Sequence, residues 1–206
     1  SHSSWPWSLG REANVFDLTR FTYYEVVDAI RKKDSKRFKF TIETNPTYGK
    51  YHWTGHRNCK VSLPPVEAIK LGNRCPVCGK KLTKGVEQRV EELADRPSGF
   101  KPQNVPGYVH LLPLSEIIAT VLGVTYPGVK KVWHVYNLLI SKFGDEYSVL
   151  LEGSLEDISA VTDLDIAEAI VQVREGKVEV IPGYDGVYGQ IVFKGSEEKK
   201  EEQPEA

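Results

Sequence analysis

The chain has 206 residues, of which 40% are hydrophobic and 27% charged, and it contains three cysteines and no methionine. This composition is typical of a soluble globular protein with one or two domains. No apolar run approaches the ~18 residues that cross a bilayer, which excludes a membrane-spanning protein, and three cysteines exclude a disulfide framework. We therefore expect a cytoplasmic protein with no membrane partner. Because Ser1 is not a start residue, we also expect a processed product or a part of a longer protein.

The charge is divided unevenly along the chain. Residues 1–96 carry 18 Lys and Arg against 11 Asp and Glu, whereas residues 97–206 carry 9 against 17. A basic half joined to an acidic half favours a polyanionic partner for the first half alone. Chance segregation of charge in a chain with a net charge of −1 is the alternative that the sequence leaves open.

The basic half begins with a predicted loop at residues 1–16, which contain breakers and no hydrophobic period. Residues 17–33 predict a helix, capped at Thr22, because their apolar residues recur every three to four positions. Residues 38–42 alternate between apolar and polar side chains and predict a half-buried strand. A turn is expected at residues 45–49.

The acidic half is predicted to be mostly helical. A polar helix at residues 84–95 precedes the stretch 97–107, whose three prolines and two glycines predict a linker where the charge changes sign. Three helices, a hairpin and a charged disordered tail follow, at residues 115–122, 128–143, 162–175, 178–193 and 195–206. For the third of these helices we expect a cap at Thr162.

Two short motifs carry the chemistry of metal binding. His56 and Cys59 have two residues between them, and so do Cys75 and Cys78. Donors at this spacing can bind one metal from a single tight turn, and two such pairs supply the four N and S ligands of tetrahedral zinc. Gly79 suits the left-handed residue that closes such a turn. Four protein ligands leave no open position, so the zinc is expected to be structural rather than catalytic.

Two alternatives to this zinc site stay open at the level of the sequence. Cys59 could be a buried apolar residue beside a redox pair formed by Cys75 and Cys78. The histidine is also the least certain ligand, because His52 lies close to His56 in the sequence. We favour His56, since its spacing to Cys59 mirrors that of the cysteine pair.

Cations and aromatic residues alternate around the first motif. We interpret them as nucleic-acid-contacting residues, because cations pair with phosphates and aromatic rings stack on bases. An ordinary solvated face of a small zinc domain is the alternative. The candidate nucleic-acid-binding residues, which the resemblance described below assigns to DNA, are Lys50, Tyr51, His52, Arg57 and Lys60.

Other polar groups receive a structural interpretation. His110 and His134 lie among aromatic and apolar neighbours and are expected to be packed or surface histidines. Asp163, Asp165 and Glu168 resemble a metal cluster, but the first turn of a helix favours acids through its dipole. Capping therefore explains these three acids better than a metal does.

Several segments together resemble the endonuclease Q family. They are SHSSWPWSLGREANVF, GKYHWTGHRNC, CPVCGKKLTKGVEQRVEELADRP, YVHLLPLSEIIA and PGYDGVYGQI, spread over residues 1–193. The resemblance implies an α+β chain in three parts. They are the closing segment of a polymerase-and-histidinol-phosphatase-type (PHP) α/β barrel at 1–40, a zinc-binding domain at 41–96 and a helical C-terminal domain with a terminal hairpin at 97–195. A disordered tail at 196–206 follows.

The resemblance also implies an activity. Such proteins, best known from archaea, nick DNA 5′ to deaminated bases such as uracil and hypoxanthine or to abasic sites. The last metal motif of their barrel reads Asp-Ser-His, so His2 resembles the final ligand of a divalent metal site holding Zn, Mg or Mn. The expected partners are damaged DNA and the N-terminal barrel portion of the same protein. Alone, the chain is expected not to cleave. A pocket for a flipped base could be lined by Trp5, Trp7, Tyr51, His52 and Trp53, and packing in the core is the alternative for these residues.

The chain departs from the pattern of the family in two places. TIETNPTY replaces the usual acidic and aromatic stretch before GKYH, and Thr54 stands where the family usually has an aspartate. Two other functions remain as alternatives. The first is a non-catalytic zinc module that binds nucleic acid or protein, and the second is a phosphatase-like or helicase-associated protein.

Overall fold

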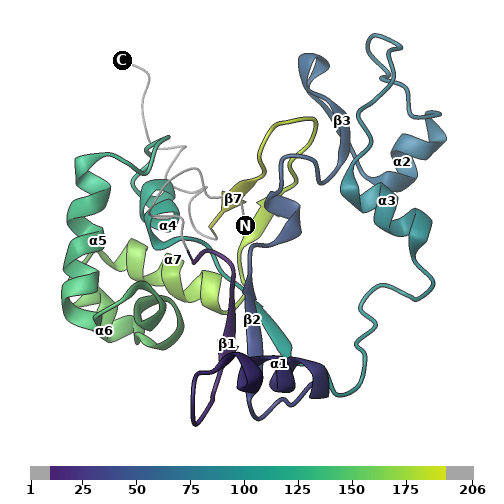
Figure 1. The fold of residues 1–206 in the computed structure, drawn as a ribbon. Helices are drawn as coiled ribbons and strands as arrows, with labels where there is room; N and C mark the ends of the chain where they lie inside the picture. Colours follow the sequence, from purple (N-terminus) through teal and green to yellow (C-terminus); the bar gives the residue numbers. More distant parts are fainter. Residues whose placement is uncertain (1–9, 194–206) are drawn as a thin grey trace, which may run out of the picture. The chain divides into compact units, whose positions relative to one another are not determined.

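A computed structural model describes residues 10–193, and the chain divides into two compact units (Figure 1). Unit 1 comprises residues up to Thr44 together with Pro102–Lys177, and unit 2 comprises Asn45–Lys101 together with the chain from Val178 onward. The two units are therefore interleaved in the sequence. This differs from the linear division expected above, in which the terminal hairpin belonged to the helical segment.

Unit 1 contains a three-stranded sheet in the order β1-β2-β5. Strand β1 (Ala13–Phe16) runs antiparallel to β2 (Phe38–Glu43), and β5 (Gly107–His110) runs parallel to β2. The expectation of a loop throughout residues 1–16 was wrong at β1, because a four-residue strand is too short to show a clear alternation. Strand β5 returns the chain to this sheet directly after the predicted linker. The described strands form open sheets, and the barrel stays a prediction.

Helix α1 (Tyr23–Lys32) follows β1 and begins where the sequence predicted its cap. The Oγ1 atom of Thr22 accepts a hydrogen bond from the backbone N–H of Glu25 at 3.3 Å. The helix ends at Lys33, a residue in the left-handed conformation whose N–H satisfies the last helical carbonyl groups. Its aromatic residues Tyr23 and Tyr24 are largely exposed.

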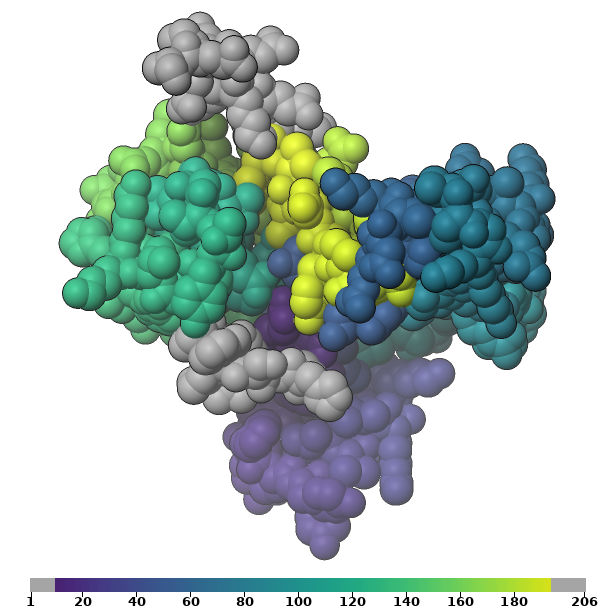
Figure 2. All heavy atoms as spheres, turned by 90° about the horizontal axis from the view of Figure 1, so that it is seen from above, coloured from purple at the N-terminus to yellow at the C-terminus, as the bar shows by residue number. Residues whose placement is uncertain are grey.

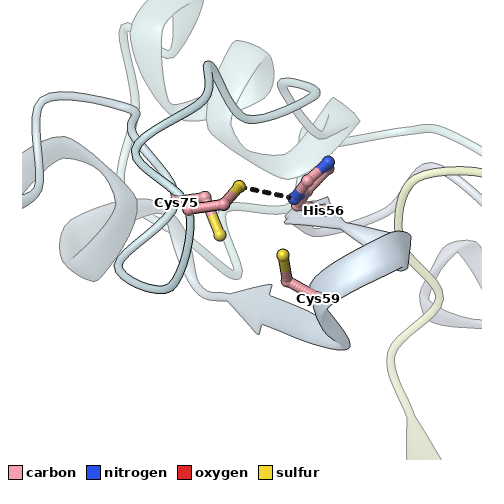
Figure 3. Close-up of side chains that lie close together, drawn as sticks. His56, Cys59 and Cys75 are labelled. Carbon is pink, nitrogen blue, oxygen red and sulfur yellow. Dashed lines mark hydrogen bonds between the residues drawn. The ribbon is translucent and has the colours of Figure 1, made fainter.

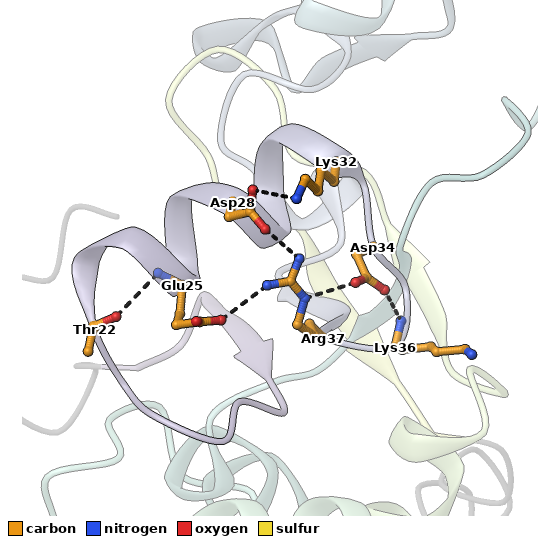
Figure 4. Close-up of polar contacts among 7 residues, drawn as sticks. All are labelled: Thr22, Glu25, Asp28, Lys32, Asp34, Lys36 and Arg37. Atoms are coloured by element: carbon orange, nitrogen blue, oxygen red, sulfur yellow. Dashed lines mark hydrogen bonds and ion pairs between the residues drawn. The ribbon is translucent and has the colours of Figure 1, made fainter.

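Arg37, which lies between α1 and β2, forms internal ion pairs with three carboxylates (Figure 4). The guanidinium group of Arg37 donates to three carboxylates, those of Glu25 at 3.1 Å, Asp28 at 2.7 Å and Asp34 at 2.8 Å. Its hydrogen bonds hold the pKa of Asp28 and of Asp34 below the ordinary value. Arg37 therefore ties α1 to the start of β2, and its charge is balanced within the chain.

Four helices and one π-helical segment form the rest of unit 1. They are α4 (Leu114–Val121), α5 (Lys130–Phe143), the π-helical segment η4 (Ser148–Glu152), α6 (Leu155–Ser159) and α7 (Leu164–Arg174). Their apolar faces meet in a core of completely buried side chains that includes Leu114, Ile117, Ile118, Leu139, Ile158, Ile166 and Ile170. None of the helices among residues 10–193 is long and apolar enough to cross a membrane.

The ends of these helices confirm most of the sequence signals. Helix α5 stops at Gly144, which has a φ of 91° that disfavours any other residue. Helix α7 begins one residue later than predicted, with Asp163 rather than Thr162 at the cap position. Asp165 lies in the first turn of α7, where the helix dipole favours an acid.

Unit 2 is built from short elements. They are the 3₁₀ turn η2 (Pro46–Tyr48), β3 (Thr54–His56), the 3₁₀ turn η3 (Arg57–Cys59), β4 (Val61–Leu63), α2 (Pro65–Lys70), α3 (Val86–Leu93), β6 (Glu179–Ile181) and β7 (Gln190–Val192). Strands β3 and β4 pair as one antiparallel hairpin, and β6 and β7 pair as another.

The β6–β7 hairpin belongs to unit 2 because its turn is hydrogen-bonded along residues 47–53. The N–H groups of Gly183, Gly186 and Gly189 donate to the carbonyl groups of Thr47, Lys50 and Tyr48, and the Trp53 N–H donates to Gly183, all at 2.8–3.0 Å. A Cβ atom on Gly183 would lie 2.4 Å from the carbonyl oxygen of Gly49, so only glycine permits this approach. Figure 2 shows the β6–β7 hairpin, in yellow, against the blue segment that includes residues 47–53.

Candidate metal centre

The four predicted zinc ligands converge at one point of unit 2. Figure 3 labels three of them, His56, Cys59 and Cys75. The donor atoms of His56, Cys59, Cys75 and Cys78 all lie within 4.8 Å of one another. The Sγ atom of Cys78 is 3.4 Å from Nδ1 of His56. In a tetrahedral zinc site the sulfur atoms, each about 2.3 Å from the metal, are roughly 3.8 Å apart. The cluster therefore has the donor types and the spacing to hold a metal such as zinc.

Two tight turns of the same design position these ligands. In the first, Cys59 closes the 3₁₀ turn η3 and is followed by Lys60, which has a φ of 53°. In the second, Cys78 is followed by Gly79, which has a φ of 69° and donates its N–H to the Cys75 carbonyl group at 2.8 Å. The left-handed Gly79 was predicted from the sequence. Lys60 was missed, because a lysine gives no signal for this conformation.

The cysteines lie at the edge of a small apolar core. Cys75 is only 2% exposed and packs with Ala68 and Leu82. Partly buried Cys59, Val61 and Leu63 pack against the same cluster. Cys78, by contrast, is exposed. The site is therefore anchored on its inner side by packing, while one ligand remains accessible to solvent.

The protonation of the thiols differs in a way that suits a cation. Burial alone raises the pKa of Cys75, but hydrogen bonds from the backbone N–H groups of Cys78 and Val77 and from His56 lower it to about 6. The neighbouring Cys78 and burial raise the pKa of Cys59 to about 11. One thiolate thus forms readily, and a second is opposed by the first. A divalent cation would offset this repulsion, because metal binding favours the deprotonated ligands.

A buried hydrogen-bond chain links the segments of unit 2 that carry His56 and Cys75. The hydroxyl group of Thr54 donates to Oε1 of Gln88 at 2.6 Å and accepts the N–H of Gly85 at 2.9 Å. The side-chain amide of Gln88 donates in turn to Oδ1 of Asn73 at 2.9 Å. Thr54 and Gln88 are almost completely buried. The departure from an aspartate at position 54 is therefore accommodated by a neutral network, which sequence reasoning did not anticipate.

His52 does not take part in the metal cluster. Its side chain is 10% exposed, and its Nε2 atom lies 4.0 Å from a carboxylate oxygen of Glu87. Burial lowers its pKa below the ordinary value of histidine, although Glu87 opposes this shift. The choice of His56 over His52 as the clustered histidine agrees with the geometry. The same burial argues against direct contact between His52 and a phosphate group.

The other predicted DNA-contacting residues lie on the surface of unit 2. Lys50, Arg57 and Lys60 are exposed, and Tyr51 is 46% exposed. The ammonium group of Lys50 is 5.7 Å from the ring centroid of Tyr51 and equally far from that of Tyr188. Sequence reasoning missed Tyr188, because 138 residues separate it from Lys50 and no local motif links them.

The remaining histidines and tryptophans are placed as follows. His2, Trp5 and Trp7 lie outside the described residues 10–193. His110 ends β5 and packs against the ring of Tyr108 at 5.0 Å between centroids, and His134 lies on α5. Within residues 10–193, the Cys/His cluster is the one group of possible ligands close enough to share a metal.

Comparison with solved structures identifies proteins that are similar to this chain. The chain is similar to the lesion-specific endonuclease PfuEndoQ from Pyrococcus furiosus, with 36% sequence identity over 91% of the chain and a TM-score of 0.81. The chain thus resembles endonuclease Q both in sequence and in fold. It is also similar, at 36% identity and a TM-score of 0.77, to endonuclease Q solved with a 27-mer duplex substrate that has an abasic lesion at the active site. It spans 46% of each of these two chains.

Two curated relatives of the chain are uncharacterized proteins. MJ0043 of Methanocaldococcus jannaschii is 34% identical over 94% of the chain, and YqxK of Bacillus subtilis is 32% identical over 89% of it. Residues 113–177 match a family described as the MJ0043 C-terminal domain, which corresponds to helices α4–α7. The chain spans 25% of MJ0043 and 43% of YqxK.

Proposed function

We propose that the chain is the zinc-bearing, DNA-binding part of a DNA repair endonuclease. The observation that carries this proposal is the similarity to endonuclease Q over 91% of the chain, because one of the two solved relatives holds a duplex with an abasic lesion. The exposed cations around the Cys/His cluster supply the chemistry that contact with a DNA backbone requires.

The proposed role of the zinc is structural. His56, Cys59, Cys75 and Cys78 provide two pairs of soft and borderline donors, which suit zinc better than magnesium or calcium. All four ligands come from the protein, so no position is open for a water nucleophile. The metal would fix the β3–β4 hairpin against the 75–78 turn and thereby hold Arg57 and Lys60 in place.

The proposed DNA contacts use Lys50, Tyr51, Arg57 and Lys60. Each cation that pairs with a phosphate releases counterions, so binding should weaken steeply as the salt concentration rises. Tyr51 adds an exposed aromatic ring, which stacks on a base whatever its identity. These residues lie on the first of the two chain segments that build unit 2.

The proposed reaction is metal-dependent cleavage of the phosphodiester 5′ to a deaminated base, such as uracil or hypoxanthine, or to an abasic site. Divalent metal ions activate a water molecule and stabilise charge on the leaving oxygen in such reactions. His2 would provide one ligand, and the other ligands would come from a barrel outside these 206 residues. We therefore expect the chain by itself to bind damaged DNA but not to cut it.

The proposal is tested with the zinc-loaded chain and fluorescent duplexes that differ only in one abasic site. We expect tighter binding of the abasic duplex in anisotropy measurements, and no nick on a denaturing gel in the presence of Mg²⁺, Mn²⁺ or Zn²⁺. Absence of binding to either duplex would overturn the DNA-binding role. Cleavage by the chain alone would show that it holds a complete catalytic site.

A second candidate is a non-catalytic zinc module that binds nucleic acid or protein. The closed set of four donors favours it, because such a site has no catalytic position. The two candidates differ in lesion preference, since a simple module would bind intact and abasic duplexes equally. They also differ in their setting, because the enzyme requires a barrel with further His and Asp ligands in the same protein.

A further inference from the structure

Unit 2 has an exposed surface in which one lysine lies between two tyrosines. We call it the Tyr–Lys platform, and it consists of Tyr48, Lys50, Tyr51 and Tyr188. The Lys50 ammonium group is 5.7 Å from the ring centroids of both Tyr51 and Tyr188. The rings of Tyr48 and Tyr188 are 6.0 Å apart between centroids, with a tilt of 34°. Tyr188 is 58% exposed and Tyr51 46% exposed.

The backbone beneath the platform is firmly held. The Gly186 N–H donates to the carbonyl group of Lys50 at 2.8 Å, and the Gly189 N–H donates to that of Tyr48 at 3.0 Å. A Cβ atom on Gly189 would meet the carbonyl oxygen of Thr47 at 2.9 Å. Tyr188 therefore lies in a turn whose backbone is fixed on both sides, so little backbone freedom is lost when it binds a partner.

Further positive charge lies beside the platform. A Cβ atom on Gly186 would be 3.5 Å from Nη1 of Arg57 and 3.8 Å from the hydroxyl oxygen of Tyr51, which places both groups at the hairpin turn. The one acid of this turn, Asp185, already accepts a hydrogen bond from the backbone N–H of Arg57 at 2.8 Å. The guanidinium group of Arg57 and the ammonium group of Lys50 are thus close to exposed aromatic rings.

Exposed aromatic rings beside fixed cations match the chemistry of one nucleotide whose base is unpaired. The base supplies a flat face for stacking, and the phosphate supplies a negative charge for the cations. A base within an intact duplex already stacks on both faces, so the platform fits a nucleotide that has lost its partner or its neighbour. We infer that the Tyr–Lys platform binds one unpaired nucleotide, with its base on Tyr188 and its phosphate paired with Lys50 and Arg57.

This inference rests on the proposed binding of DNA and adds a residue and a mode of contact to it. A nucleotide is unpaired where the base opposite it is missing. The platform would therefore bind the nucleotide on the strand opposite an abasic site rather than the abasic site itself. Stacking of this kind tolerates any base. The platform would therefore contribute affinity for distorted DNA without selecting the sequence around the lesion.

The test uses the zinc-loaded 206-residue chain with three DNAs. They are a single strand, a duplex in which 2-aminopurine lies opposite an abasic site, and the matching duplex with a full complement. We expect Tyr188→Ala to weaken binding of the first two by about 10-fold and of the third by less than about 2-fold. Tyr188→Phe should retain affinity within about 2-fold, because the ring is kept. Emission from 2-aminopurine should change on binding to the wild type and not to Tyr188→Ala.

Matched variants separate stacking from charge and from general damage. Tyr108→Ala removes a tyrosine of nearly equal exposure, 57%, from unit 1 and should leave all three affinities unchanged. Lys50→Ala should lower the salt dependence of binding by about one unit of slope for every DNA. Circular dichroism and zinc content check that each variant is folded.

Three results would contradict the inference. Equal affinities for Tyr188→Ala and Tyr108→Ala would show that Tyr188 does not contact the DNA. Equal losses on the paired and unpaired DNAs would show backbone contact without stacking. A failed Tyr188→Phe rescue would assign the effect to the hydroxyl group. If the wild type binds none of the three DNAs, the proposed function itself fails, which is distinguishable from all three results.

Discussion

The two units of the chain are stabilised internally by different kinds of interaction. Unit 1 has a continuous apolar core, in which side chains such as Leu139 and Ile166 are completely buried. Unit 2 has a small apolar cluster around Ala68, Cys75 and Leu82, and its other buried groups include the polar side chains of Thr54 and Gln88. Hydrophobic burial can stabilise the first unit by itself. The second requires hydrogen bonds and, we expect, a metal.

This difference indicates in which unit a substitution can change binding without unfolding the whole chain. A unit with a small core depends on a few specific contacts, and each of them also positions the surface above it. In unit 2 the Cys/His cluster, the Thr54 chain and the glycine-lined hairpin all support the exposed Lys50, Arg57 and Tyr188. Perturbations of unit 2 should therefore change binding, whereas perturbations of unit 1 should change stability first.

Removal of the metal should have the largest effect on stability, and this effect should be confined to unit 2. Structural zinc contributes about 10–16 kcal/mol of apparent binding free energy to small zinc domains. We expect a strong chelator, or Cys75→Ser, to abolish protection from hydrogen exchange in residues 50–85 and to leave helices α4–α7 protected. Hydrogen exchange with mass spectrometry measures both regions in one sample.

Val77→Ala is the control for this experiment, because Val77 lies in the same turn, is 70% exposed and supplies no ligand. It should keep one zinc per chain. Equal protection of residues 50–85 with and without zinc would contradict a structural role for the metal.

A cavity in unit 1 should produce the next largest loss of stability, and this loss should leave the metal site of unit 2 intact. Leu139→Ala removes a completely buried side chain and should lower the free energy of unfolding by about 2–5 kcal/mol. Zinc content should not change. Leu138→Ala, at an adjacent position that is 42% exposed, should cost less than about 1 kcal/mol. Denaturant titration measures both values, and loss of zinc in Leu139→Ala would show that the units are coupled.

Loss of the Thr54 hydroxyl group should have a smaller effect, restricted to unit 2. Thr54→Val keeps the shape of the side chain but leaves the Gly85 N–H and the Gln88 carbonyl oxygen without a partner, which costs about 1–3 kcal/mol. Thr54→Ser should recover most of this loss. Thr120→Val changes an exposed threonine of α4 and should have little effect. Faster exchange confined to residues 50–93 is the expected signature, and a uniform change across both units would contradict it.

The smallest effect concerns pH and belongs to unit 1. Burial raises the pKa of Glu146, whose carboxylate accepts hydrogen bonds from the Leu114 N–H at 2.6 Å and the Tyr136 hydroxyl group at 2.9 Å. The folded state therefore binds its proton more tightly than the unfolded state, and this stabilisation is lost as the pH rises through the folded pKa. Glu146→Gln cannot ionise, so its stability relative to the wild type should increase from pH 4 to pH 7.

Melting temperatures measured at several pH values give this difference. Glu156→Gln, at an exposed position of α6, is the matched control. A difference that falls with pH for Glu146→Gln would mean that the ionised carboxylate stabilises the fold.

Local signals in the sequence were sufficient for much of the fold. Helices α1 and α5 and strand β2 follow from periodicity, and the cap at Thr22 and the stop at Gly144 follow from local chemistry. The strands β1 and β5 were not recognised, since each has four residues and is stabilised by pairing with β2. The paired residues are 22–29 positions apart for β1 and β2 and 67 positions apart for β2 and β5, and such pairing leaves no local trace because the folded chain selects the partner.

The sequence by itself determined the chemistry of the candidate metal site, because two ligand pairs at a fixed spacing need only local turns to present four donors. Only the tertiary structure decided which surface surrounds that site. It buried His52 beside Glu87, paired the hydroxyl group of Thr54 with Gln88, and brought Tyr188 beside Lys50. The physical reason is the same in each case. Burial and backbone pairing act between segments that are distant in sequence, and their effect on a side chain cannot be derived from its neighbours along the chain.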